Sequence, residues 1–137
     1  MARDKFHYEV RTALEGEGWV ITNDPLNVKV GKIPMQIDLG ADKLIGAERA
    51  GEKIAVEIKT FNLSTFITSF YEAIGKYIVY REALLEVESE RILYLAVPKT
   101  MFDEYGKEPL VARVFAVNKI KIIIYEPQAQ IITSWLM

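Results

Sequence analysis

Three residues from two neighbouring stretches of the sequence could together perform metal-dependent chemistry. Asp38 directly follows an apolar run, and Glu57 and Lys59 end the later apolar run at residues 54–59. Side chains alternate along a strand, so Glu57 and Lys59 point to the same face, about 6–7 Å apart. If Asp38 ends the adjacent strand of a hairpin, two carboxylates and one ammonium group meet. That set can hold a divalent cation beside an amine, as metal-dependent cleavage of a phosphodiester bond requires.

Other carboxylates compete for the role of Asp38. Asp42 and Glu48 also lie between the two predicted strands. Asp38 is preferred because it ends an apolar strand and is followed closely by Gly40, where the backbone can turn away from a ligand.

The composition excludes most catalytic groups other than carboxylates and lysines. The 137 residues contain no cysteine, which excludes thiol chemistry and cysteine-based metal sites. The one histidine, His7, lies near the start of the first predicted helix, and we expect a solvated surface group there. The net charge of −2 argues against broad coating of DNA, which relies on excess Lys and Arg, but it leaves a local basic groove open. Catalysis would therefore use carboxylates, lysines and a metal ion.

Hydrophobic periodicity predicts the elements that position these side chains. Helices are predicted at 5–16, with Asp4 as N-cap, and at 108–117. A longer helix, capped by Ser64 or Thr65, carries an apolar stripe from Phe66 to Leu85. Strands are predicted at 19–22, 27–30, 35–39, 43–48, 53–60, 91–97, 119–125 and 131–135.

This pattern predicts an α/β (α+β) fold, a mixed sheet flanked by helices in the order α-β-β-β-α-β-α-β, as one domain over residues 1–137. The charged N-terminus leads to no apolar segment of a signal peptide, and no apolar run reaches the length of a membrane span. We therefore expect a soluble, cytoplasmic protein without a membrane partner.

The placement of Asp38 and the Glu57-x-Lys59 pair on adjacent strands before a helix resembles the PD-(D/E)XK nuclease superfamily, with its restriction-endonuclease-like core. Ile37 stands where the name of the motif has proline, a position that is held loosely. The chain resembles more closely the XisH family, described as controlling factors for excision of the fdxN DNA element in cyanobacteria. The segments that carry this likeness are residues 24–26, 28–31, 37–49, 51–59 and 90–98.

The superfamily resemblance implies a role for each matching position. Asp38 and Glu57 would hold Mg²⁺, with Mn²⁺ as a substitute. Lys59 would orient or activate the attacking water and offset charge on the phosphate. Glu9 would be the acid that many members add from the first helix, and Lys76 would be the residue of the long helix that faces the site.

Plainer interpretations exist for several of these residues. Glu57 and Lys59 also fit a solvated strand face with a weak ion pair, worth about 0–1 kcal/mol. Glu9 also fits the polar flank of an amphipathic helix. Lys29 and Lys32 could contact phosphate, although a solvated turn is the commoner explanation.

The resemblance implies a Mg²⁺-dependent, endonuclease-like protein that acts on DNA in programmed excision or rearrangement. It also implies a companion protein of the XisI type. Two alternatives stay open: a non-catalytic regulatory protein of the excision machinery that binds DNA or the companion, and a toxin-like nuclease restrained by the companion. Association into a homo-oligomer also stays open.

Overall fold

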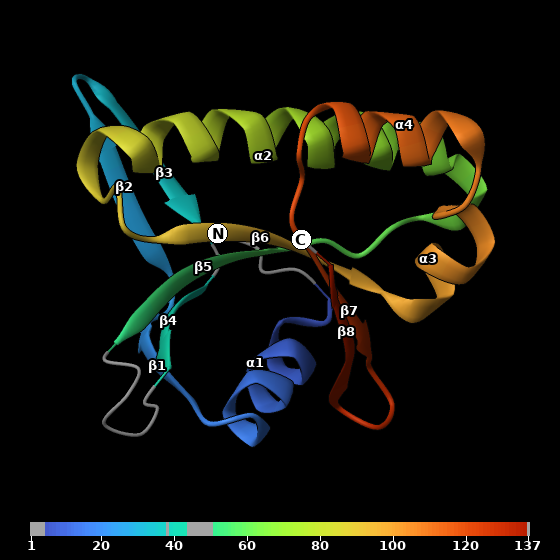
Figure 1. Ribbon diagram of the computed structural model, residues 1–137, viewed down its shortest axis with the longest axis horizontal. Helices are drawn as coiled ribbons and strands as arrows, with labels where there is room; N and C mark the ends of the chain where they lie inside the picture. Colours follow the sequence, from blue (N-terminus) through green and yellow to red (C-terminus); the bar gives the residue numbers. More distant parts are fainter. Residues whose placement is uncertain (1–4, 38, 44–50, 137) are drawn as a thin grey trace.

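The computed structural model describes residues 5–37, 39–43 and 51–136, with the backbone alone for 39–43. The helical elements are α1 (His7–Gly16), the 3₁₀ turn η1 (Leu63–Thr65), α2 (Phe66–Val87), α3 (Lys99–Tyr105) and α4 (Pro109–Val117). The strands are β1 (Trp19–Asn23), β2 (Leu26–Val30), β3 (Ile33–Ile37), β4 (Leu39–Lys43), β5 (Glu52–Ile58), β6 (Ile92–Pro98), β7 (Ile122–Glu126) and β8 (Ile131–Leu136). Figure 1 shows their arrangement.

Six of these strands form one mixed sheet in the order β1-β4-β5-β6-β7-β8, and β2 and β3 form a separate hairpin. The pairs β5–β6 and β6–β7 are parallel, whereas the outer pairs β1–β4, β4–β5 and β7–β8 are antiparallel. A parallel pair needs a long crossover, which α2 supplies between β5 and β6. The predicted α/β class with a mixed, helix-flanked sheet is confirmed. The predicted element order counts only three strands between the first two α-helices, although five strand ranges are predicted there, and the described chain has all five, β1 to β5.

Each face of the sheet carries its own apolar layer. On one face Phe70 and Tyr77 of α2 pack in a cluster with Leu95 of β6. On the other face Val10 of α1 packs in a second cluster with Val56 of β5. Figure 1 shows α2 and α4 on one side of the sheet and α1 on the other. Helices α1 and α2 therefore pack against opposite faces of the same central strands.

The sheet curls around α1. Trp19 of β1 and Trp135 of β8 belong to the two edge strands, yet their rings stack with centroids 5.8 Å apart. Trp135 also meets Tyr94 of β6 edge to face at 5.0 Å, and its indole N–H donates to Glu17 just after α1. In Figure 1 the β1–β4 and β7–β8 pairs descend on either side of α1.

The buried stripe of α2 differs from the prediction at its C-terminal end. Phe66, Phe70 and Tyr77 are buried as predicted, but Leu85 is 59% exposed and Leu84 is the buried residue. Leu84 follows Tyr77 by seven residues, which is two helical turns and keeps the same side of the helix.

Within the described residues no helix is both long and apolar enough to cross a membrane, α2 included.

The strand boundaries around Gly40 also differ from the prediction. Strands predicted at 35–39 and 43–48 are replaced by β3, which ends at Ile37, and β4, which begins at Leu39. Gly40 lies inside β4 and pairs with Ala55, so it is no turn residue. The predicted N-cap of α1, Asp4, lies outside the described residues.

The start of the long helix is built differently from the predicted cap. The side chain of Thr65 forms no capping hydrogen bond at α2. The Asn62 side chain instead accepts the Ser64 backbone N–H (3.1 Å) and caps η1. A short 3₁₀ turn therefore leads into α2.

Candidate active site at the end of strand β5

Glu57 is a buried carboxylate on the α2 face of the sheet. Ile54, Val56 and Ile58 lie in the α1-side cluster, and Ala55 lies in the α2-side cluster, so the alternation predicted for β5 is present. Glu57 shares the parity of Ala55 and is only 6% exposed. A carboxylate at such depth needs compensating partners, because burial of a lone charge is costly.

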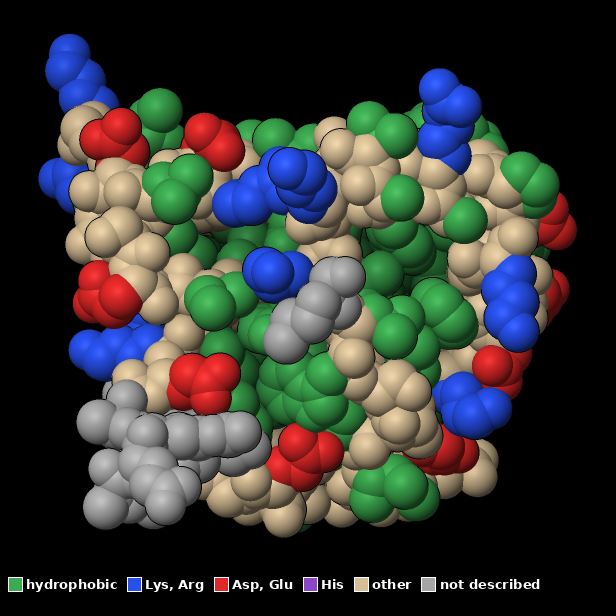
Figure 2. Space-filling model, viewed as in Figure 1, with side chains coloured by type: hydrophobic (Ala, Val, Ile, Leu, Met, Phe, Trp, Pro, Cys, Tyr) green, Lys and Arg blue, Asp and Glu red, His purple; other side chains and the backbone are tan. Residues whose placement is uncertain are grey.

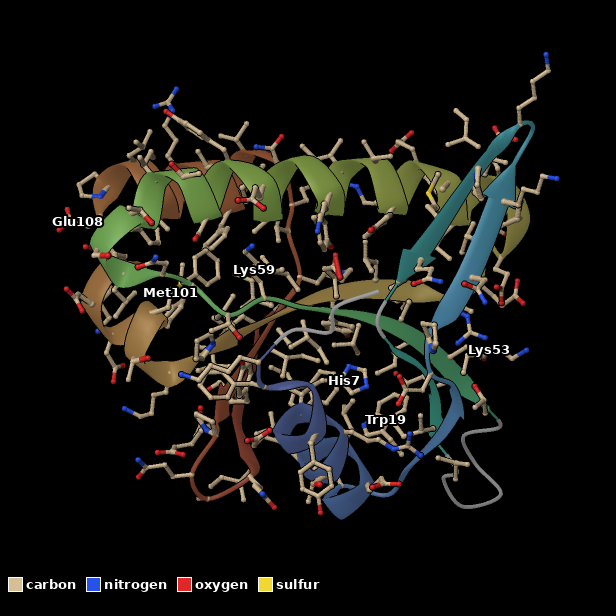
Figure 3. All side chains as sticks on the ribbon, turned by 180° about the vertical axis from the view of Figure 1, so that it is seen from behind. His7, Trp19, Lys53, Lys59, Met101 and Glu108 are labelled. Carbon is tan, nitrogen blue, oxygen red and sulfur yellow. The ribbon has the colours of Figure 1, made fainter. Side chains whose placement is uncertain are left out.

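Lys59 directly follows β5 and continues its pairing with β6. The Lys59 backbone N–H donates to the Ala96 carbonyl (3.0 Å). Its side chain is 17% exposed, and its Nζ lies 3.6 Å from Oε2 of Glu72, a residue of α2. Figure 3 shows Lys59 in the space between the end of β5 and α2, with His7 on the other side of that strand. The predicted common face of Glu57 and Lys59 is thus the α2 face.

The segment after Lys59 is tied to α2. The Asn62 backbone N–H donates to Ser69 Oγ of α2 (3.2 Å), a residue that is itself buried. Tyr105 at the end of α3 donates its hydroxyl to the Leu63 carbonyl (3.3 Å). These contacts fix the path of the chain directly behind the lysine. The position of Lys59 over the sheet therefore depends on α2 and α3 as well as on β5.

Of the three carboxylates predicted as partners of Glu57, only Asp42 lies within the described residues. Asp38 and Glu48 lie outside the described residues. Asp42 pairs with Lys53 in the backbone register of β4 and β5. Lys53 precedes Glu57 by four residues, about 13 Å along a strand. The register thus separates Asp42 from the carboxylate it was considered to accompany.

Glu9 and Lys76 stay predictions. Glu9 is half-buried on α1, the helix that covers the face opposite Glu57. Lys76 is exposed on α2, one turn after Glu72. Among the residues that the structure describes, no group of three or more His, Asp or Glu side chains gathers as metal ligands.

The expectation of a solvated His7 is wrong. His7 is only 8% exposed, and its Nε2 lies 2.8 and 2.9 Å from the two carboxylate oxygens of Asp24. Arg11, one turn further along α1, donates to the same carboxylate at 2.7 Å. This cluster joins α1 to the turn between β1 and β2. Asp24 lies 17 residues from His7 in sequence, and no local pattern reveals such a pairing.

Glu72 is the site residue that sequence reasoning missed. It lies among polar positions of α2 and has no distinguishing neighbour in the sequence. The one available signal was its spacing of four residues from Lys76, which puts both on one side of the helix.

The fold and the β5 site together define a class: a mixed-sheet α/β protein with a buried carboxylate and a lysine at the end of one strand. The family model of the XisH protein matches residues 1–133. This chain belongs to the XisH family.

Two solved structures are similar to this chain over almost all of its length. An XisH family protein from Nostoc punctiforme PCC 73102 shares 39% identity with a TM-score of 0.89, covering 98% of this chain and 100% of that one. An fdxN element excision controlling factor protein from Anabaena variabilis shares 38% identity with a TM-score of 0.88 and the same coverage. No curated protein matches the sequence.

Proposed function

We propose that this protein is a Mg²⁺-dependent, endonuclease-like factor of the PD-(D/E)XK superfamily that acts on DNA in programmed excision or rearrangement. The observation that carries the proposal is the buried Glu57 carboxylate followed by Lys59 on the α2 face. The fdxN element excision controlling factor from Anabaena variabilis, similar along the whole chain, supports the biological setting.

The donor chemistry fits a hard divalent cation. Glu57 offers carboxylate oxygens in a buried position, and Mg²⁺ and Mn²⁺ both favour such ligands. The second proposed ligand is Asp38, which precedes Leu39 in the sequence. Leu39 pairs with Val56, the residue before Glu57. Asp38 and Glu57 are thus each the neighbour in sequence of a residue in this pair, which supports their assignment as the two ligands.

Each residue then has a distinct role. A bound Mg²⁺ would supply Lewis acidity that lowers the pKa of a coordinated water and offsets phosphate charge. Glu57 and Asp38 would hold the ion. The Lys59 ammonium would orient the attacking water and stabilise the negative charge that develops on the phosphate. Glu72, which pairs with Lys59, would keep that ammonium over the sheet.

Nicking of supercoiled plasmid in Mg²⁺ tests this assignment. Glu57→Gln and Lys59→Ala should each lower the nicking rate by at least about 100-fold, as expected when a ligand or a charge-stabilising donor is removed. Lys53→Ala, at the opposite end of β5 (Figure 3), is the matched control and should stay within about threefold of wild type. Circular dichroism melting checks that each variant folds.

The proposal fails if the wild type cuts none of supercoiled, linear, single-stranded and cruciform DNA with either ion. It also fails if Glu57→Gln and Lys59→Ala cut as fast as the wild type. A calorimetric Mn²⁺ titration of wild type against Asp38→Ala tests the second ligand separately, and weaker binding in the variant is expected.

A second candidate is a non-catalytic regulatory protein that binds a companion of the XisI type. The acidic balance of the chain favours it, because a net charge of −2 suits a protein partner better than unaided DNA binding. The words "controlling factor" in the name of the Anabaena variabilis relative point the same way. Pull-down with the companion, combined with DNA binding in its presence and absence, separates this function from cleavage.

A further inference from the structure

The segment between α4 and β7 separates two hollows on one face of the molecule. The larger is a cleft of about 590 Å³, and the smaller has a volume of about 160 Å³. Lys119 and Lys121 line both. Figure 2 shows this face, with a hollow lined by hydrophobic side chains and with Lys and Arg side chains gathered near the middle. The two hollows therefore adjoin across one short, basic segment.

The larger cleft is apolar apart from its lysines. Two phenylalanines, Phe102 of α3 and Phe115 of α4, form part of its wall. Ile122 and Leu136 contribute from β7 and β8. Its volume lies in the range of about 300–1,000 Å³ that is typical of ligand sites. Such walls can receive a flat, apolar or aromatic group without offering it hydrogen-bond acceptors from side chains.

The smaller hollow is cationic. Besides the two lysines it is lined by Arg81 of α2 and Arg91. Arg91 is already engaged, because its guanidinium donates to Glu88 (3.0 Å) and to the Ile54 carbonyl (2.8 Å). Within the described part of the chain, neither lysine forms a salt bridge and no Asp or Glu lines either hollow. Three cations thus face the solvent in a chain whose net charge is negative.

One buried tyrosine, Tyr77, contacts both the Arg81 side chain and the backbone of Lys121. The Arg81 guanidinium lies 5.3 Å from the centroid of the Tyr77 ring and donates to the Asn118 carbonyl (2.6 Å). The Tyr77 hydroxyl donates to Leu93 (2.9 Å) and accepts the Lys121 backbone N–H (3.1 Å). The Arg81 guanidinium and the backbone of Lys121 are therefore fixed before any ligand binds.

Lys119 occupies a backbone conformation that usually favours glycine. Its φ is +54°, two residues after the end of α4 at Val117. The Ile120 N–H donates to Phe115 (3.0 Å) and the Lys119 N–H to Ala116 (3.2 Å), the two bonds of a Schellman motif. A lysine side chain at this position is more strained than glycine would be. Its presence places a cation on the wall between the hollows.

We propose that these hollows bind single-stranded nucleic acid, with an unpaired base in the apolar cleft and the flanking phosphates at Lys119, Lys121 and Arg81. Stacking on aromatic side chains beside a cationic track is the general mode of sequence-tolerant single-strand binding. Three cations suit successive phosphates better than the single head group of an aliphatic anion. The cleft lies against β7 and β8, with β6 between it and Glu57 in β5. The inference therefore goes beyond the proposed cleavage and needs no metal ion.

Fluorescence anisotropy of labelled decathymidylate, measured in EDTA over a salt series, tests the proposal independently of cleavage. Lys119→Gln with Lys121→Gln should weaken binding at least tenfold. The slope of log K against log salt should become shallower by about 1.4, because each lost phosphate contact of a single strand removes about 0.7. The control, Lys5→Gln with Lys53→Gln, removes the same charge outside both hollows and should leave affinity within twofold.

The apolar cleft is tested by filling it. Ala116 lines the cleft at an exposed position of α4, so Ala116→Leu should fold normally and weaken binding about fivefold without changing the salt slope. Val117→Leu, at the next and strongly exposed position outside the cleft, is the matched control.

Three results would overturn the proposal. The wild type could leave decathymidylate unbound, or both lysine pairs could weaken binding equally, which would mean general surface electrostatics. Thermal stabilisation by dodecanoate or thymidine 5′-phosphate without binding of decathymidylate would assign the hollows to a small amphipathic anion instead.

Discussion

The two faces of the sheet use their charged groups in opposite ways. On the α1 side the charges are paired in a largely buried cluster, with Asp24 between His7 and Arg11. On the α2 side Lys59 Nζ lies 3.6 Å from the half-exposed Glu72, and Lys119 and Lys121 line the two hollows. Charges that are paired inside the protein hold elements together, whereas charges within reach of solvent can still bind a ligand. The charges on the α1 face therefore connect elements of the fold, and those on the α2 face are the ones to which we assign ligand binding.

The largest expected effect on stability is at Asp24. Asp24→Ala should lower the free energy of unfolding by about 3 kcal/mol, because it leaves the buried His7 and the Arg11 guanidinium without their shared carboxylate. Urea unfolding at neutral pH measures the change. The control is Asp103→Ala, which removes an exposed pair with Lys99 and should cost below about 1 kcal/mol. Equal losses of unfolding free energy in the two variants would show that the buried cluster around Asp24 stabilises the fold no more than an exposed ion pair does.

A smaller loss is expected at Tyr77, which links α2 to the basic segment. Tyr77→Phe leaves the Leu93 carbonyl and the Lys121 N–H without their hydroxyl partner and should cost about 1–2 kcal/mol. Tyr71→Phe, on the exposed side of the same helix, should be close to neutral. The difference between the urea midpoints of Tyr77→Phe and Tyr71→Phe measures this loss of stability. The variant should also weaken decathymidylate binding, since it loosens Lys121.

The same tyrosine gives the protein a sensitivity to alkaline pH. Burial raises the pKa of Tyr77, against smaller opposing effects of the Lys121 N–H and Arg81. The folded protein thus retains this proton to a higher pH than the unfolded chain. Its contribution to stability is intact below the usual tyrosine pKa of about 10 and falls as pH rises through the raised pKa. Tyr77→Phe should show a shallower loss of stability above about pH 10, as followed by urea midpoints.

Local sequence patterns were sufficient to place the core of the candidate site. The alternation along β5 put Glu57 and Lys59 on one face, because strand geometry repeats every two residues whatever the fold. The apolar stripe of α2 was equally visible up to Tyr77. It failed at Leu85 because two neighbouring leucines satisfy the same period, and only packing decides between them.

The proposed binding surface at Arg81 and Lys121 depends on contacts between distant parts of the chain. Arg81 reaches the carbonyl of Asn118, which is 37 residues away, and Lys121 meets Tyr77 across 44 residues. The local sequence pattern around Arg81 or Tyr77 does not predict a contact with the segment at 118–121. The same reason accounts for His7, whose partner lies beyond β1. Sequence reasoning thus predicted the common face of the candidate residues Glu57 and Lys59 and missed the contacts that tertiary packing makes between distant segments.

The smallest effect should come from Glu72, where the contrast between structural and functional charges is sharpest. Glu72 is 54% exposed, so Glu72→Gln should change the free energy of unfolding by less than about 1 kcal/mol. It contacts Lys59 and has no place among the proposed metal ligands, so plasmid nicking should change by less than about tenfold. Glu82→Gln, exposed on the same helix, removes the same charge as a control. A loss as large as that of Lys59→Ala would mean that Glu72 acts on substrate or metal, and the reactive end of β5 would then extend onto α2.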